Sequence, residues 1–99
     1  MSEADAMKVV ICTIELFLPD VGSLKAKRQI IKSITQRIRS RINASVAETG
    51  FQDCWQRAVI GVAMVSSSGT LLDRQVNFIR DIVDDCAEAE TVEFLVEYV

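Results

Sequence analysis

Histidine is absent from the 99 residues of this chain, which also contains only one proline, four glycines and three cysteines. Without an imidazole the chain has no histidine general acid or base, and zinc sites that depend on histidine are excluded. The cysteines, Cys12, Cys54 and Cys86, are odd in number and widely spaced. They indicate reduced thiols rather than a disulfide framework. Composition alone leaves open a carboxylate site for magnesium or calcium.

Long apolar runs are missing as well, and no basic segment followed by an apolar stretch marks a secretory signal. We therefore expect a cytoplasmic protein that does not enter the membrane. A chain that is 49% hydrophobic and 25% charged has the composition of an ordinary globular protein, and its length suits one domain. We expect this domain to span residues 7–99, after a polar, flexible tail over residues 1–6.

Acidic residues are lacking between Val21 and Ala47, where seven of the eleven basic residues lie. The whole chain has a formal net charge of −3, so residues outside this segment carry a net charge of −10. Such a separation of charge can steer a charged partner through its electrostatic field.

The same segment has the clearest helical periodicity, from Ser23, a suitable N-cap, to Ile42. One face of this helix is apolar and should be buried: Leu24, Ile31, Ile34, Ile38 and Ile42. Four basic residues form a second stripe that cannot face the same core: Lys25, Arg28, Lys32 and Arg39. The remaining three basic residues are expected on the other flank: Lys27, Arg37 and Arg41.

Period-two alternation predicts four strands, over residues 8–18, 44–49, 55–66 and 91–98. A second helix is expected from Thr70, which with Asp73 resembles a capping box, to about Cys86. The order β-α-β-β-α-β predicts an α+β, ferredoxin-like sandwich. Its four-stranded antiparallel sheet should have the order 4-1-3-2, with both helices on one face.

Several short motifs, taken in this order, resemble the YlxP-like family, which comprises small bacterial domains of unknown function. They are Leu18-Pro19, then SLKAKR at 23–28, SVAE at 45–48, Gln52-Asp53 and WQRA at 55–58. The resemblance implies a ferredoxin-like fold, and it brings no established activity, cofactor or catalytic residue. Genes of this family often lie beside translation and ribosome-maturation genes, which by association raises the expectation of RNA or ribosome contact.

The basic stripe has two interpretations. In the first, Lys25, Arg28, Lys32 and Arg39 follow a phosphate backbone and make the helix a nucleic-acid-binding surface. In the second, the basic residues of the first helix neutralise an acidic cluster at the end of the second helix: Asp81, Asp84 and Asp85. For the stripe, the sequence favours neither interpretation over the other, because only one flank of the first helix can face the second.

The face of the sheet that no helix covers is the second candidate surface. Strand parity places an apolar set there that favours self-association: Ile11, Trp55, Val59, Ala63, Val65 and Leu95. An RNA-recognition motif would carry aromatic residues at the middle of the two central strands. This chain has Thr13, Gly61 and Ala63 there, which argues against base stacking on the sheet.

The sequence therefore predicts a non-catalytic binding domain, without metal or cofactor, whose partner is RNA or the ribosome. A protein–protein adaptor that acts through the open sheet face is the alternative. A phosphoryl-handling enzyme of acylphosphatase-like topology is a distant third. The turn at Pro19–Ser23 could form its phosphate cradle, but the strand over residues 55–66 lacks the asparagine that such enzymes need.

Overall fold

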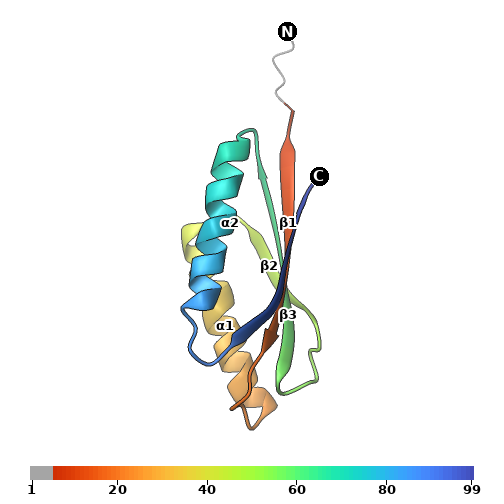
Figure 1. Cartoon of the computed structure of the whole chain (residues 1–99), viewed down its shortest axis with the longest axis vertical. Helices are drawn as coiled ribbons and strands as arrows, with labels where there is room; N and C mark the ends of the chain where they lie inside the picture. Colours follow the sequence, from red (N-terminus) through yellow and green to blue (C-terminus); the bar gives the residue numbers. More distant parts are fainter. Residues whose placement is uncertain (1–5) are drawn as a thin grey trace.

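Six elements follow one another in the predicted order in a computed structural model that describes residues 6–99. They are β1 (Lys8–Phe17), α1 (Leu24–Arg41), β2 (Ser45–Gly50), β3 (Arg57–Ser66), α2 (Gly69–Asp84) and β4 (Glu90–Tyr98). The two helices run in opposite directions along the sheet (Figure 1). The expected tail over residues 1–6 lies, except for Ala6, outside the described residues.

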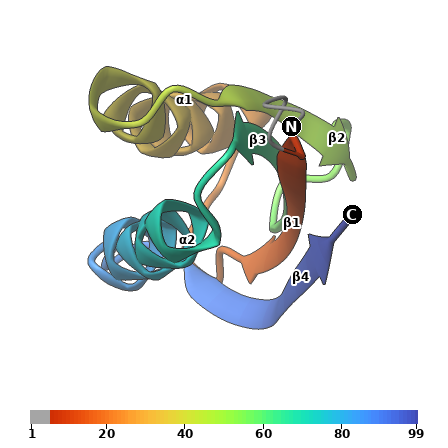
Figure 2. The same cartoon turned by 90° about the horizontal axis from the view of Figure 1, so that it is seen from above.

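All strand pairs in the single sheet are antiparallel, and the strand order is β2-β3-β1-β4. This is the predicted 4-1-3-2 order named from the opposite edge, so the fold class is confirmed. Figure 2 shows both helices on the same side of the twisted sheet. Within residues 6–99 no helix lies over the other face, as the alternation of the strands predicted.

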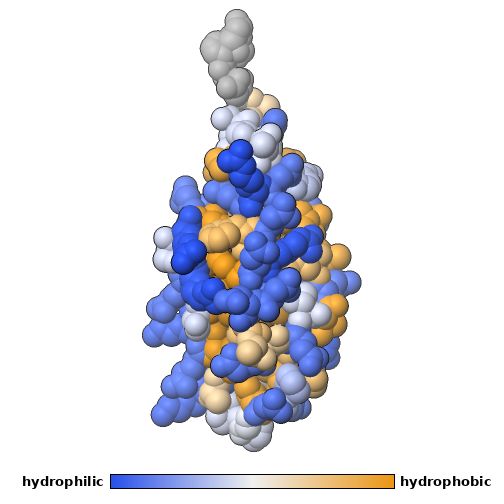
Figure 3. Space-filling model, turned by 60° about the vertical axis from the view of Figure 1, so that its left-hand side comes forward, coloured by the Kyte–Doolittle hydropathy of each residue, from blue (hydrophilic) through white to orange (hydrophobic). Residues whose placement is uncertain are grey.

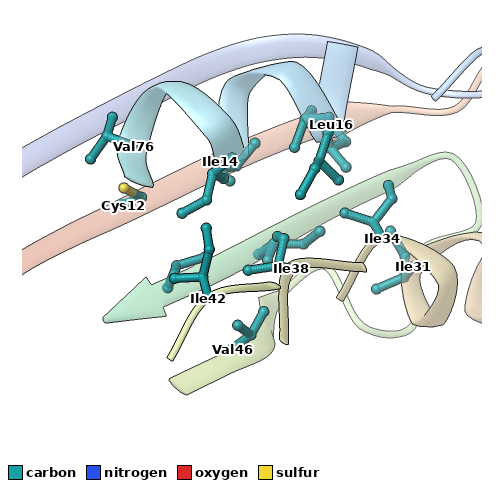
Figure 4. Close-up of a cluster of buried hydrophobic side chains, with 14 of the residues drawn as sticks. Cys12, Ile14, Leu16, Ile31, Ile34, Ile38, Ile42, Val46 and Val76 are labelled. Atoms are coloured by element: carbon teal, nitrogen blue, oxygen red, sulfur yellow. The ribbon is translucent and has the colours of Figure 1, made fainter. Parts of the chain in front are cut away.

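The core lies between this sheet and the helices, and it is built by strand parity and helical periodicity together. Every second residue of β1, from Val10 to Leu16, is fully buried, and Ile31, Ile34 and Ile38 of α1 point toward them (Figure 4). Each isoleucine buried in this way contributes about 1.5–3 kcal/mol, which offsets the poor intrinsic helix propensity of β-branched residues. Tertiary packing, and not local propensity, therefore stabilises α1.

The cysteines are free thiols, as their number and spacing predicted. Cys12 lies in the core on β1, where burial raises the pKa of its thiol above the ordinary value, and the Arg80 guanidinium opposes this shift. A thiol with a raised pKa stays protonated at neutral pH and is a poor nucleophile.

The start of each helix is fixed by a serine. Ser23 caps α1 as predicted, because its hydroxyl accepts a hydrogen bond of 3.0 Å from the amide of Ala26. For α2 the expected Thr70 cap is wrong: Ser68 accepts from the amide of Leu71 at 3.1 Å, and the helix begins at Gly69. The Thr70–Asp73 spacing fits a capping box, but Ser68 lies in the extended conformation that an N-cap requires.

The largest correction concerns the start of β3, which was expected at Trp55 and begins at Arg57. Residues 51–56 form a loop in which Phe51 adopts a positive φ of 56° and the amide of Cys54 donates to the carbonyl of Phe51 at 3.0 Å. The chain needs these residues to turn from β2 to β3. The alternation of apolar residues happens to continue from β3 back into the loop, and for this reason the sequence predicted Trp55 on the sheet.

Neither of the two helices in residues 6–99 combines the length and the apolar character that crossing a lipid bilayer requires.

Candidate nucleic-acid interface

Three residues of the predicted basic stripe lie on the outer surface of α1. Lys25, Arg28 and Lys32 are exposed, and within residues 6–99 their side chains form no ion pair or hydrogen bond. Figure 3 shows the side of the molecule that carries the helices, where hydrophilic side chains surround a smaller apolar area. We call Lys25, Arg28 and Lys32 the free basic set.

A shallow groove on the same helix runs beside Lys32. The residues that line it are all of polar types, although their side-chain stems contribute much of its surface: Gln29, Lys32, Ser33, Gln36, Arg37 and Ser40. Amide, hydroxyl, ammonium and guanidinium groups all donate hydrogen bonds, and none of these residues is acidic. The groove therefore extends the free basic set with neutral donors that suit phosphate and sugar oxygens.

Arg39, the fourth residue of the predicted stripe, has a different role. Its guanidinium donates to the carbonyl of Val46 on β2, an edge strand of the sheet. Glu48 lies two residues after Val46 on the same strand, and its carbonyl accepts a hydrogen bond of 2.7 Å from the side-chain amide of Gln52. These two side chains satisfy carbonyls of the exposed edge, which would otherwise offer a template for pairing with another strand. Arg39 therefore stabilises the sheet edge and does not extend the free set.

Lys27 is fully buried, whereas the sequence predicted it on the flank with Arg37 and Arg41. Its ammonium donates to the carbonyls of Phe51 at 2.6 Å and Cys54 at 2.7 Å, and it lies 2.9 Å from a carboxylate oxygen of Glu48. The two carbonyls accept hydrogen bonds from the ammonium, and the Glu48 carboxylate pairs with its charge without forming a hydrogen bond. A signal for this burial was present, because Ile34 and Ile38 follow Lys27 by about two and three turns and share its face of the helix.

The flank of α1 that faces α2 confirms only part of the expected neutralisation. Arg37 forms an ion pair of 3.2 Å with Asp85, and Arg41 lies over the ring of Phe78 at 5.6 Å. Asp81 and Asp84 form no ion pair within residues 6–99. Because the Arg37–Asp85 pair is exposed to solvent, it contributes no more than about 0–1 kcal/mol.

The loop over residues 51–56 lies at the end of the sheet where α1 begins. Trp55 is 52% exposed and Phe51 is 40% exposed. The guanidinium of Arg57 stacks on the Phe51 ring at 3.9 Å and pairs with Glu15 at 2.5 Å. Trp55 therefore belongs to a loop that exposes aromatic surface, and not to β3 as the sequence predicted.

On the open face, four of the six predicted self-association residues come together. The strand register pairs Ile11 with Ala63, places Val65 diagonally from Ile11, and puts Leu95 on the next strand. Val59 lies further along β3, half-buried against Gly50, where an added Cβ would approach it to 3.2 Å. We call Ile11, Ala63, Val65 and Leu95 the open-face cluster.

The described part of the chain contains no group of three or more Cys, Asp or Glu side chains placed to hold a metal ion. Its recognisable binding features are therefore the basic surface of α1, the loop over residues 51–56 and the open-face cluster.

Comparison with known proteins then decides the family. Residues 9–96 match the sequence model of a family described as "Protein of unknown function (DUF503)". The chain belongs to the DUF503 family. It is also 38% identical, over 76 residues, to the protein named "Uncharacterized protein YlxP" from Bacillus subtilis (strain 168). The match covers 77% of this chain and 83% of that relative. The predicted resemblance to the YlxP-like family is thus confirmed.

Neither description names an activity, so the function of this DUF503 domain has to be argued from its surfaces. The seven basic residues of α1 divide into those that contact other parts of the fold and those that do not. Four of them contact other parts of the fold: Lys27, Arg37, Arg39 and Arg41. The free basic set of three remains on the surface.

Proposed function

We propose that this domain binds RNA through the phosphate backbone, using the outer surface of α1. The observation that carries the proposal is the free basic set: Lys25, Arg28 and Lys32 are exposed and have no acidic partner among residues 6–99. No acidic residue occurs between Val21 and Ala47, so the field of these cations is not cancelled within the helix. Binding phosphates there would release condensed counterions and gain free energy.

The position of the free basic set along the helix supports an anionic ligand. Lys25 and Arg28 lie in the first two turns, and the first turn contains no acidic residue. Positive charge near a helix N-terminus is disfavoured by about 0.3–1 kcal/mol for each group, because the unpaired amides there already carry partial positive charge. A phosphate bound at this end would relieve that repulsion and would also interact with the helix dipole.

A pair of charge-matched double variants tests the proposal. Lys25→Glu/Lys32→Glu and Lys8→Glu/Arg74→Glu each change the net charge by −4, and all four residues are exposed. Binding of a labelled single-stranded RNA would be measured by fluorescence anisotropy near 150 mM salt. We expect the first variant to lose about tenfold or more in affinity, equivalent to about 1.4 kcal/mol or more, and the control to lose much less. Equal losses would refute a local site on α1.

We also propose that the domain self-associates through the open-face cluster. Ile11, Val65 and Leu95 are large apolar side chains that remain exposed on neighbouring strands, on a face that no helix covers. Val65→Asp should shift a dimer to monomer without unfolding it, because the side chain is already in contact with water. Light scattering at tens of micromolar protein provides the measurement, with Leu71→Asp on α2 as the control. A wild-type protein that is monomeric at this concentration would contradict the proposal.

Partner capture separates RNA binding from the alternative, a protein–protein adaptor. The tagged domain would be recovered from lysate with and without ribonuclease treatment. Ribosomal RNA or ribosomes that are lost on ribonuclease treatment would support RNA as the partner. Co-purification of one protein that resists ribonuclease and is lost on Val65→Asp would support the adaptor instead.

A further inference from the structure

The loop over residues 51–56 is held in place by many contacts, although it lies at the surface. The Gln56 side chain donates to the carbonyl of Pro19 at 2.9 Å, and the amide of Leu18 donates to the carbonyl of Gln56 at 2.8 Å. On its other side Gln52 donates to Glu48, and Arg57 holds both the Phe51 ring and Glu15. The conformation of the loop is therefore fixed before any partner arrives.

The strongest of these contacts is the ammonium of Lys27, which is 0% exposed. Burying an ammonium is costly unless it is paired and hydrogen-bonded, and here both of its hydrogen-bond acceptors are carbonyls of this loop. A sequence that needed only a connection between β2 and β3 could use a short turn without a buried charge. The lysine instead ties the loop to the first turns of α1.

This tie places the aromatic loop beside Arg28, which lies about 100° around α1 from Lys27, whereas Lys25 and Lys32 lie about 140–160° from Lys27 on the outer surface of the helix. Arg28 follows Lys27 directly. It lies about three helical turns before Arg39, or roughly 16 Å toward the start of α1, on the same flank. Arg39 contacts Val46 on β2, which runs in the opposite direction to α1 (Figure 1), so the five residues from Val46 to Phe51 cover roughly 17 Å toward the same end of the helix. Arg28 therefore stands level with Phe51, at the side of α1 that carries the loop.

Aromatic surface next to unpaired basic side chains is the combination that binds single-stranded nucleic acid. Cations hold the backbone, while an exposed ring stacks with a base that is free of duplex pairing. Trp55, 52% exposed on a fixed loop, offers such a ring without the loss of conformational entropy that a mobile loop would incur. The centre of the open sheet face offers none, because its residues are Thr13, Gly61 and Ala63.

We infer that this domain selects single-stranded RNA over duplex RNA by stacking an unpaired base on Trp55 while the free basic set holds the adjoining phosphates. The inference rests on the proposed function, since it assigns a substrate class to the same surface. Bases inside a duplex are already stacked on one another and cannot reach the ring, so duplex RNA would contact only the cations.

The test uses the fact that Trp55 is the only tryptophan of the chain. Its fluorescence would be followed while the protein is titrated with a 12-nucleotide oligo(A), with a duplex of the same length, and with inorganic polyphosphate, which has no bases. We expect oligo(A) to quench Trp55 strongly. Duplex RNA and polyphosphate should bind, as measured by competition with labelled RNA, with little quenching.

Substitution of Trp55 provides the second arm. Trp55→Ala should weaken oligo(A) binding by about 5- to 150-fold, the range that loss of one stacked base gives. It should leave polyphosphate binding unchanged. Trp55→Phe should restore most of the loss, because it keeps an aromatic face, and Leu71→Ala is the control for removal of an exposed apolar side chain. Thermal melts of all variants would confirm that the loop change has not unfolded the domain.

The outcomes distinguish this inference from the proposed function. If Lys25→Glu/Lys32→Glu does not weaken the binding of RNA or polyphosphate, or if neither ligand binds the wild-type protein, the proposed function fails and the inference fails with it. If RNA binds through the free basic set but Trp55→Ala has wild-type affinity, the proposed function stands and stacking on Trp55 is refuted. Equal affinity for oligo(A) and duplex RNA would also refute the inference.

Discussion

Lys25 and Lys27 are two residues apart on the same helix, yet their surroundings are opposite. Lys25 extends from α1 into solvent and has no partner among residues 6–99, whereas Lys27 is fully buried and contacts three oxygen atoms. The two side chains have the same chemistry, and only their direction from the helix axis differs. One is available to a ligand, and the other is part of the fold.

This contrast extends to the whole helix and shows why a count of charges says little about binding. Three other basic residues contact neighbouring elements: Arg37 pairs with Asp85, Arg39 donates to the carbonyl of Val46, and Arg41 lies over the ring of Phe78. A basic helix therefore supplies both tertiary contacts and a binding surface, and tertiary structure is needed to divide its residues between the two.

The largest expected effect comes from removing the buried cation. Lys27→Met keeps an apolar stem of similar length but leaves the Glu48 carboxylate without its cation and two loop carbonyls without their donor. Breaking a buried ion pair from one side typically costs about 3–5 kcal/mol, and we expect a loss of that order in the free energy of unfolding. Urea denaturation followed by circular dichroism gives the measurement.

Lys25→Met is the matched control, and it should change the free energy of unfolding by less than about 0.5 kcal/mol, as exposed substitutions usually do. Glu48→Gln provides a milder variant if Lys27→Met does not fold, because the amide oxygen can still accept from the ammonium. Equal stability of the Lys25→Met and Lys27→Met proteins would show that the buried contact does not matter to the fold.

The next effect in size concerns the edge of β2. Arg39→Met removes the donor to the carbonyl of Val46, and the net loss for one hydrogen bond to a charged group is about 1.5 kcal/mol. Arg28→Met, on the same flank but without a partner among residues 6–99, should cost less than about 0.5 kcal/mol. The two variants compared by urea denaturation distinguish edge protection from general charge loss, and equal values would exclude a specific role for Arg39.

The smallest effect is expected at the contact between the helices. Arg37→Met removes an exposed ion pair with Asp85, so the loss should lie between about 0 and 1 kcal/mol and should diminish as salt screens the pair. Thermal melts at 50 mM and 500 mM salt measure both quantities. A loss of stability as large as that of Lys27→Met, or one that salt does not reduce, would contradict this prediction. It would mean that the acidic end of α2 stabilises α1 by more than an exposed ion pair can.

The sequence predicted the fold well because its signals are local and redundant. The isoleucines of α1 recur with helical spacing, the even residues of β1 are uniformly apolar, and Ser23 lies directly before the helix. Errors arose where two local signals competed. Thr70 with Asp73 satisfied a capping pattern that Ser68 fulfils in the structure, and the alternation around Trp55 continued past the true start of β3.

The candidate site was less predictable, because its composition depends on contacts between distant residues. No local pattern shows that Arg39 reaches Val46 or that Lys27 reaches the loop after β2. The helical position of Lys27 does place it among the buried isoleucines, but residue type argues the other way, because lysine is seldom buried. The prediction of Trp55 on the open face fails because the apolar alternation extends beyond the true start of β3 at Arg57.

The most direct test of the account is the salt dependence of RNA affinity. Lys25→Met/Arg28→Met/Lys32→Met removes the free basic set without reversing any charge. Each phosphate contact on a single strand contributes about 0.7 to the slope of log affinity against log salt concentration, so three contacts predict a slope smaller in magnitude by about 2 in the triple variant. Lys8→Met/Arg74→Met should leave the slope unchanged. A triple variant with the wild-type slope would contradict the claim that these three side chains bind phosphate.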